Sequence, residues 1–403
     1  MKKEPLLFLC HRIPFPPNKG DKIRSFNMLK ALSQSFDVYL GCFVDDPFDW
    51  QYSDKLDKYC KQKLLIKQDK TMAKIKGLKA FISGEAISVP YYFSQAMAKW
   101  TNGILVKEKI KQVFVYSSSM AQYVEGDNYS HLNRVIDFVD VDSDKWNQYA
   151  EGKKGIARWV YQREWRKLQH FENVIATQFQ HSLFVSPQEA NLFKQQIPGT
   201  VASKVSGMLN GVDTAFFSPD NLDIKSIDEK VDVVFTGAMD YWANVDSVIW
   251  FCQKVWPLVR AKFPEAHFYV VGGNPTTQVQ SLDGKLGVKV TGRVEDVRPF
   301  IRNAKVAVAP LQIARGLQNK VLEAMSMAKP IVATSMAIEG IEARNKNIHI
   351  CDNPLIFAEL VCNYLIQSTT AHASREWILD NLQWRESLSR LPTLFNGTTE
   401  HAE

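Results

Sequence analysis

One stretch of the sequence, residues 306–334, combines groups that could bind a phosphorylated ligand. Residues 306–309 and 331–333 are short apolar runs that predict buried parallel strands, and the apolar spacing of residues 319–327 predicts a helix between them. Gly316 precedes this helix, and Lys320 lies on its first turn. Free backbone N–H groups and the helix dipole attract anions at such a helix start, and Lys320 adds a cation.

Glu323 follows Lys320 by one helical turn. Its carboxylate could accept hydrogen bonds from a vicinal diol, as an acidic residue does for the ribose in dinucleotide-binding folds. A phosphate site and a ribose acceptor at this spacing together predict a nucleotide. An ordinary strand–helix–strand unit with an amphipathic helix is the alternative that the pattern leaves open.

The composition is that of a globular protein, with 45% hydrophobic and 23% charged residues in a chain of 403. This length predicts two or three domains. No apolar run approaches the roughly 20 residues of a membrane-spanning helix, and residues 5–10 are too few for a signal peptide. The six cysteines show no CxxC spacing, which argues against zinc and disulfides and favours a reducing, cytoplasmic compartment.

Strand and helix patterns alternate along most of the chain, which predicts an α/β fold with parallel sheets. The strands are expected at residues 6–10, 36–43, 114–116, 135–136, 182–185, 231–237, 268–271, 288–290, 306–309 and 331–333. Helices are expected from residues 21, 187, 244 and 296, and over residues 157–176, 319–327 and 384–395.

Three motifs carry a resemblance to a known family. Residues 323–326 read Glu-Ala-Met-Ser, residues 329–332 read Lys-Pro-Ile-Val, and residues 210–219 contain Asn-Gly-Val-Asp followed by Phe-Ser-Pro. The chain resembles retaining glycosyltransferases of the GT-B fold, family 4. Residues 16–29 further resemble the sugar transferases of bacterial exosortase-linked exopolysaccharide loci.

The resemblance implies two Rossmann-like domains that face a central cleft, with a C-terminal helix crossing back to the first domain. Residues 1–210 would form the acceptor-binding domain and residues 211–382 the nucleotide-sugar-binding domain. Residues 383–403 would form the crossover helix and tail.

The chain departs from the family at charged positions. Arg315 stands where the family has the first glutamate of a pair, eight residues before Glu323. Ala238 and Ala243 stand where an arginine and a lysine bind the donor diphosphate. We expect Arg315 and Lys320 to supply the missing charge from the opposite loop, since arginine suits bidentate phosphate contacts. Loss of the donor site is the alternative.

The resemblance also implies roles for individual residues. Arg315, Lys320, Gly237 and Gly20 would hold the diphosphate, Glu323 would bind the ribose, and Arg293 and Val294 would flank the base. The full set of predicted donor-binding residues is Gly20, Gly237, Arg293, Val294, Arg315, Gly316, Leu317, Asn319, Lys320 and Glu323.

The first half supplies three candidate catalytic residues, Asp21, Asp137 and Asp140. Carboxylates at the carboxyl ends of strands lie where ligands bind in open α/β sheets. Lys22 and Arg24 are expected to add positive charge there. The serines at 117–119 stand where many family members have a histidine near the transferred sugar.

The aspartates at 137, 140, 142 and 144 form a cluster that could bind a metal or simply cap helices. The resemblance implies a metal-independent enzyme without a cofactor.

The predicted function is therefore retaining transfer of a sugar from a nucleotide-diphosphate donor to a glycan or lipid-linked acceptor, in bacterial exopolysaccharide or other cell-surface polysaccharide synthesis. Two alternatives stay open: a non-catalytic GT-B binding protein of a polysaccharide export system, and a GT-B nucleotide-sugar epimerase. No nucleic-acid motif is present, and nucleic acid is not expected as a partner.

Two basic segments, residues 55–79 and 153–167, are interleaved with apolar and aromatic residues. Such segments are typical of helices that lie on anionic membranes, although a solvated helix face over a packed core gives the same pattern. The expected location is the cytoplasm, with the cytoplasmic face of the inner membrane as a further partner surface.

Overall fold

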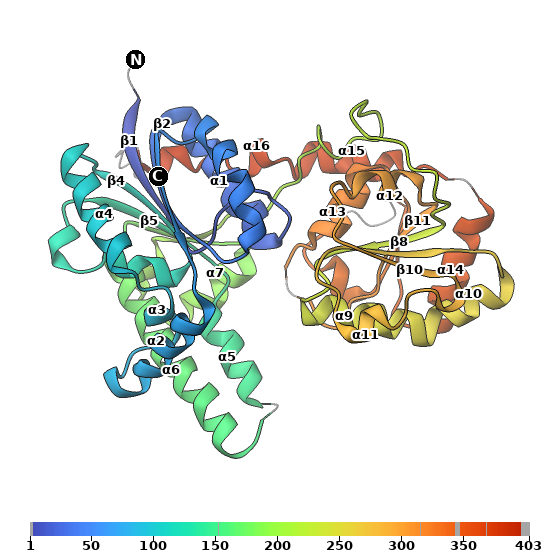
Figure 1. The fold of residues 1–403 in the computed structure, drawn as a ribbon, viewed down its shortest axis with the longest axis horizontal. Helices are drawn as coiled ribbons and strands as arrows, with labels where there is room; N and C mark the ends of the chain where they lie inside the picture. The colour runs from blue at the N-terminus through green and yellow to red at the C-terminus, as the bar shows by residue number, and fades with distance from the viewer. Residues whose placement is uncertain (1–2, 152, 315, 343–346, 368, 396–403) are drawn as a thin grey trace. The chain divides into compact units, whose positions relative to one another are not determined.

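The computed structural model describes residues 3–151, 153–314, 316–342, 347–367 and 369–395 (Figure 1). The chain forms two compact units. The first contains Met1–Leu209 and Ser387–Glu403, and the second contains Asn210–Glu386. The predicted boundaries at 210/211 and 382/383 lie close to these divisions.

The first unit is built on a parallel sheet of seven strands in the order β3-β2-β1-β4-β5-β6-β7. The strands are β1 (Glu4–Cys10), β2 (Phe36–Val44), β3 (Gln62–Lys67), β4 (Gln112–Tyr116), β5 (Asn133–Val139), β6 (His181–Phe184) and β7 (Val205–Gly207). The five predicted strands of this unit are confirmed. The two edge strands, β3 and β7, were not predicted, because β3 carries two lysines and is only partly buried, and β7 has three residues.

Helices cover the first sheet, and local sequence explains several of their ends. They are α1 (Gly20–Ser35), α2 (Lys70–Ser83), α3 (Ser88–Tyr91), α4 (Gln95–Lys107), α5 (Asp142–Glu151), α6 (Gly155–Gln178), α7 (Pro187–Lys194) and α8 (Gly199–Ala202), with 3₁₀ segments η1 (Pro47–Lys58), η2 (Ser118–Tyr123) and η3 (Asp127–Tyr129). The Ser186 side chain caps α7 by accepting from the Glu189 N–H, and Pro187 occupies the first turn.

The second unit has a parallel sheet of six strands in the order β10-β9-β8-β11-β12-β13. They are β8 (Val233–Thr236), β9 (Phe268–Val271), β10 (Val288–Gly292), β11 (Val306–Ala309), β12 (Ile331–Ala333) and β13 (Ile348–Ile350). All five predicted strands are confirmed. The inner strands β8, β9, β11 and β12 read as continuous apolar runs because both of their faces are buried. The edge strand β13 is largely exposed and was not predicted.

The helices of the second unit are α9 (Trp242–Trp250), α10 (Trp256–Lys262), α11 (Thr277–Gln280), α12 (Arg298–Asn303), α13 (Asn319–Ser326), α14 (Pro354–Ile366), α15 (His372–Asn381) and α16 (Trp384–Ser387). Helix α13 lies between β11 and β12, as predicted. Its apolar face packs inward through Val321, Leu322 and Met325. Chain order places the start of α13 next to the carboxyl end of β11.

The end of the chain returns to the first unit, but not as the single helix predicted over residues 384–395. Helix α16 is short, and a separate 3₁₀ turn, η7 (Pro392–Phe395), follows it. The Phe395 ring contacts Phe36 and Phe114 of the first sheet. The alternation of strand and helix in both units confirms the predicted α/β class with two Rossmann-like parts.

Candidate functional site

Strand register determines which residues of the first unit share the carboxyl edge of the sheet. Cys10 pairs with Cys42 on one side and with Tyr116 on the other, and Tyr116 pairs with Asp137. These residues form one row across β2, β1, β4 and β5. The residue that follows each strand therefore lies at the edge where open α/β sheets bind ligands.

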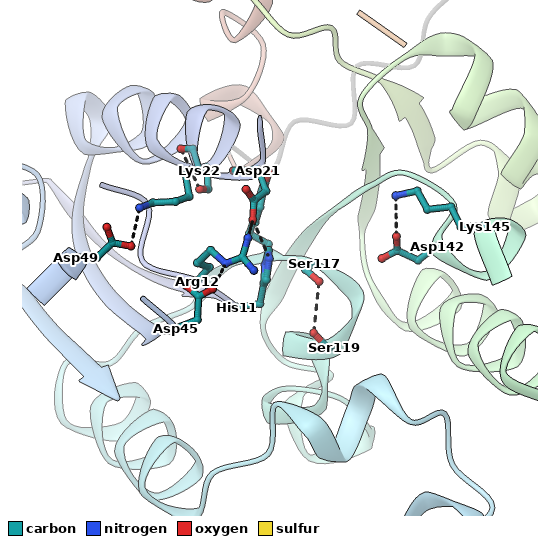
Figure 2. A network of polar contacts seen from close by, with 12 residues as sticks. His11, Arg12, Asp21, Lys22, Asp45, Asp49, Ser117, Ser119, Asp142 and Lys145 are labelled. Carbon is teal, nitrogen blue, oxygen red and sulfur yellow. Dashed lines mark hydrogen bonds and ion pairs between the residues drawn. The ribbon is translucent and has the colours of Figure 1, made fainter. Parts of the chain in front are cut away.

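A polar network occupies this edge (Figure 2). Asp21, in the first turn of α1, accepts a hydrogen bond from Arg12 and lies 3.5 Å from the His11 Nε2 atom. The Arg12 guanidinium also contacts Asp45, with Nε 3.0 Å from Oδ2. Burial raises the pKa of Asp21, but the His11 hydrogen bond and the Arg12 charge outweigh burial and hold the pKa well below its usual range. Asp21 is therefore an ionised carboxylate that orients its neighbours.

His11 is a functional candidate that the sequence reasoning missed. Its ring stacks on Tyr116 with centroids 5.8 Å apart and meets Tyr92 edge-on at 5.6 Å. Its Nδ1 atom is buried and has no hydrogen-bond partner among the described residues. The family resemblance led us to expect a histidine directly after β4. Because β1 pairs with β4, His11 at the end of β1 lies next to the end of β4 instead. The sequence feature that could have identified His11 is its position directly after the first predicted strand.

The expectation that Lys22 and Arg24 add positive charge to the site is wrong. Lys22 is buried and donates to Asp49 at 2.9 Å. Arg24 is buried too and makes bonds of 3.0 and 2.7 Å to the Asp137 carboxylate. Both cations point into the unit because their helix face packs on the sheet, and each is neutralised by a buried acid.

Asp137 is fully buried, and its geometry does not support the predicted catalytic role. One carboxylate oxygen accepts both Arg24 bonds, and the other accepts the Val139 N–H at 2.8 Å. Arg24 also donates to the Met208 carbonyl at 2.8 Å. The pair therefore ties α1 to β5 and to the end of the first unit.

Asp140 is partly exposed and belongs to a second cluster at the same edge. The Lys145 ammonium lies 2.7 Å from Asp140. It also lies 3.0 Å from Asp142, a contact that Figure 2 shows. Burial lowers the pKa of Lys145, but the charges of Asp142 and Asp140 outweigh it and raise the pKa. Lysine thus neutralises two members of the aspartate cluster. Among the described residues, no group of three or more histidine, cysteine or acidic side chains is arranged to hold a metal ion.

Backbone strain marks the ends of two strands at this edge. Ser117, after β4, has a φ of 79°, and Val139, at the end of β5, has a φ of 73°. A positive φ is costly for a β-branched residue. Val139 is held there by its N–H bond to Asp137 and by the Val185 N–H, which donates to its carbonyl at 2.6 Å. Strain of this kind often accompanies a ligand site.

In the second unit, the loops after β8 and β9 approach each other closely. A Cβ atom on Gly272 would lie 1.7 Å from the Gly237 carbonyl oxygen, so position 272 requires glycine. The Gly237 N–H donates to the Val271 carbonyl at 3.0 Å, and the Asn244 side chain fills the space beside Gly237. Gly237 therefore permits close packing of the two loops, and its N–H is used within the unit. Its role beside the donor diphosphate stays a prediction.

Lys320 reaches from α13 to this loop. Its ammonium donates to the Asn244 Oδ1 atom at 2.8 Å and lies 5.1 Å from the centre of the Phe235 ring. The Asn244 amide in turn donates to the Ala238 carbonyl at 2.9 Å. Lys320 therefore joins the start of α13 to the segment in which Ala238 and Ala243 replace the expected cations.

Lys320 and Glu323 are both partly shielded from water. Burial lowers the pKa of Lys320 to about 8, partly opposed by the Glu323 charge. Burial also raises the pKa of Glu323 to about 7, partly opposed by Lys320. A bound anion would stabilise the charged form of Lys320, and hydroxyl groups that donate hydrogen bonds would stabilise the charged form of Glu323.

The other predicted donor residues gather around the same edge of the second sheet, except Gly20, which is exposed at the start of α1 in the first unit. Gly316 has a φ of 63°, Leu317 is buried, and the Asn319 Oδ1 atom is buried without a hydrogen-bond partner among the described residues. Arg293 is exposed beside Gly273, and Val294 is partly buried. Arg315 lies outside the described residues.

Residues 230–367 match a family model described as glycosyl transferases group 1. The match covers most of the second unit, including Lys320 and Glu323, and no residue of β1–β7. No curated protein matches the chain.

Solved structures match nearly the whole chain. Sucrose-phosphate synthase from Thermosynechococcus elongatus is 14% identical with a TM-score of 0.67, and the match covers 98% of each chain. WaaG, a glycosyltransferase involved in lipopolysaccharide biosynthesis, is 15% identical with a TM-score of 0.65, covering 98% of this chain and 100% of its own. HepE from Anabaena, in complex with UDP and glucose, is 13% identical with a TM-score of 0.66, covering 98% and 100%.

At these identities the structural likeness establishes the fold, which is GT-B as predicted. The second unit matches the group 1 family model, and the chain has the GT-B fold. Together these two findings support the assignment of the chain as a glycosyltransferase.

Proposed function

We propose that this chain is a retaining glycosyltransferase that moves a sugar from a nucleotide-diphosphate donor to a glycan or lipid-linked acceptor. The bond from the anomeric carbon to the diphosphate oxygen breaks, and the electron pair leaves with the diphosphate. The acceptor oxygen forms the new bond to that carbon, and its proton passes to the departing diphosphate. Positive charge develops on the sugar ring in such a transition state, and negative charge develops on the leaving group.

The observation that carries this proposal is the contact between Lys320 and Asn244. Asn244 directly follows Ala243, the position where the resembling family has its diphosphate-binding lysine. Lys320 brings an ammonium from α13 to the first turn of α9, at 2.8 Å from the Asn244 side chain. This geometry supports the idea that the charge missing from α9 is supplied by α13.

The electrostatics of the site favour a diphosphate ligand. A cation with a lowered pKa has lost hydration without gaining a full counter-charge, so an incoming phosphate would stabilise its charged form. Glu323, one turn further along, would accept from the ribose hydroxyls. Arg293 and Val294 would flank the base, and Arg315 is a second cation for the diphosphate.

The acceptor side of the proposal rests on the first unit. His11 replaces Asp137 as the residue proposed to contact the acceptor hydroxyl or the transferred sugar, because its Nδ1 atom keeps an unused hydrogen-bonding position. Asp21 would orient the imidazole from the Nε2 side. Asp140 remains a candidate at the same edge.

The biological setting is also a proposal. Bacterial exopolysaccharide or other cell-surface polysaccharide synthesis would place the enzyme in the cytoplasm or on the cytoplasmic face of the inner membrane, acting without a metal or cofactor. The likeness to HepE, solved with UDP and with UDP-glucose, makes uridine nucleotides the first donors to test. No helix among the described residues is long and apolar enough to cross a membrane.

The test is a thermal-shift panel with UDP, GDP, ADP and their common sugars, followed by turnover of the labelled donor that binds. A ligand at about 100 times its dissociation constant stabilises the folded state by roughly 2.7 kcal/mol, which is readily measured. Labelled sugar on an acceptor supports the transferase, and a free epimer supports the epimerase. Binding without turnover supports a non-catalytic protein, and no binding contradicts the donor site.

A further inference from the structure

Two helices of the first unit expose apolar and aromatic side chains beside a strongly basic segment. Ile156 and Trp159, on the first turns of α6, are 83% and 58% exposed. The Trp159 ring stacks on Phe81 of α2, with centroids 6.3 Å apart, and Phe81 is itself 36% exposed. We call Ile156, Trp159 and Phe81, with the exposed cations around them, the α6 platform.

The α6 platform is rigid for a surface of this kind. The Arg163 guanidinium lies 4.7 Å from the centre of the Phe81 ring and donates to the Ala80 and Glu85 carbonyls. On the other side of α6, Tyr161 packs against Trp146 of α5, with centroids 5.4 Å apart. These contacts fix α2 and α5 to α6, so the exposed rings keep a set orientation. Figure 1 shows α5 and α6 extending together from the sheet.

Exposed cations surround the apolar groups, and acids are nearly absent from this segment. Between residues 153 and 170 the only acidic side chain is Glu164, which is buried and accepts the Ile87 N–H at 2.8 Å. The exposed cations are Lys153, Lys154, Arg158, Arg166 and Lys167. The segment therefore carries an excess of exposed cations directly beside exposed tryptophan, phenylalanine and isoleucine, with the exposed acids Glu85 and Glu151 at its margins.

We propose that the α6 platform docks on an anionic phospholipid bilayer. Indole and phenyl rings are stable at the level of lipid headgroups, while lysine and arginine reach anionic phosphates along flexible stems. Charge complementarity favours this occupant over a second copy of the chain, because two such platforms would repel each other. The proposed function includes a location on the inner membrane, and the α6 platform would be the surface that contacts it. Docking does not depend on donor binding.

The other basic segment, residues 55–79, contributes less than the sequence suggested. It is divided among η1, the edge strand β3 and the start of α2, so it does not form one amphipathic helix. Leu64 and Ile66 of β3 pack against the core. The lysines of β3 instead discourage pairing of the exposed sheet edge with another chain.

The experiment is co-sedimentation of the full chain with vesicles of phosphatidylcholine alone and of equimolar phosphatidylcholine and phosphatidylglycerol. Binding is expected only to the anionic vesicles and should weaken with salt. An Ile156→Gln/Trp159→Gln variant should lose on the order of ten-fold or more in partitioning, since two exposed apolar groups can no longer be buried. An Arg166→Ala/Lys167→Ala variant should lose about five-fold per cation.

Matched controls change exposed groups of the second unit. Leu355→Gln/Ile366→Gln alters side chains that are 62% and 70% exposed on α14, and Lys225→Ala/Lys230→Ala removes two exposed cations. Both control variants should bind vesicles like the original chain. Thermal unfolding of all four confirms folding.

Equal binding to neutral and anionic vesicles would overturn the proposal, and so would unchanged binding of the α6 variants. A dimer seen without lipid and lost in the Trp159 variant, with no vesicle binding, would identify a protein interface instead. Nucleotide binding, measured without vesicles, reports separately on the proposed function.

Discussion

Replacing Lys320 by methionine separates stability from donor binding. The folded protein lowers the pKa of this lysine from 10.5 to about 8 because the ammonium is removed from water. At about 1.36 kcal/mol per pKa unit, keeping Lys320 charged costs up to about 3 kcal/mol of folding stability at neutral pH. Partial exposure of the side chain reduces this figure. The variant also loses the hydrogen bond to Asn244, which subtracts about 1 kcal/mol from its gain in stability.

The expected result is a more stable protein that binds nucleotide less well. At pH 7 the Lys320→Met variant should gain about 1–2 kcal/mol, which raises the melting temperature of the second unit by roughly 2–8 °C. The folded pKa lies below the unfolded pKa, so the folded state holds fewer protons between about pH 8 and pH 10.5. The original protein therefore gains stability across this window as the pH rises, and its disadvantage disappears above it.

Nucleoside-diphosphate affinity should fall by about 10- to 100-fold in the same variant, since a hydrogen bond to a charged group contributes about 1.5–3 kcal/mol. Calorimetric titration measures this change. Lys329→Met is a matched control, because burial also lowers the Lys329 pKa to about 8 while its ammonium donates to the Arg302 and Ala304 carbonyls. The control should keep its nucleotide affinity. A Lys320→Met variant that is less stable at pH 7 and binds nucleotide normally would refute the reasoning.

Three further predictions follow from the same geometry. Nucleotide affinity should be highest between about pH 7 and pH 8. Glu323 loses its charge below its pKa of about 7, and Lys320 loses its charge above its pKa of about 8. A nucleotide affinity that does not change with pH would contradict this prediction. Asp137→Asn should destabilise the first unit by about 3–5 kcal/mol in urea unfolding, by leaving Arg24 buried without its counter-charge, and should not alter nucleotide affinity. Gly272→Ala should weaken nucleotide binding by on the order of ten-fold, because the new Cβ would displace the Gly237 carbonyl, whereas Gly103→Ala meets open space and should bind normally.

Sequence patterning was sufficient for the architecture. Buried parallel strands read as short apolar runs, and the helix over residues 319–326 shows its buried face at regular spacing. These are local signals, because each element is specified by neighbours a few residues away. The same locality explains why the start of α13 could be predicted from the sequence. The edge strands β3, β7 and β13 were missed because their local patterns are short or interrupted by polar residues.

The chemical environment of the charged residues needed the tertiary structure. Lys22 and Arg24 look like exposed cations on a first helical turn, yet Arg24 pairs with an aspartate 113 residues away inside the core. His11 reaches the end of β4 only because β1 lies next to it in the sheet. Burial and long-range pairing depend on how elements stack, which no local pattern contains.

Lys320 shows both contributions in one residue. Its type and its place after Gly316 indicated an anion site at a helix start. Its contact with Asn244, 76 residues earlier in the chain, and its lowered pKa exist because α13 and α9 both begin at the carboxyl edge of one parallel sheet. The sequence alone thus predicted the fold, and it indicated the kind of ligand that we propose. The packing of distant elements decided which charges remain available to bind it, because desolvation and ion pairing are set by neighbours in space.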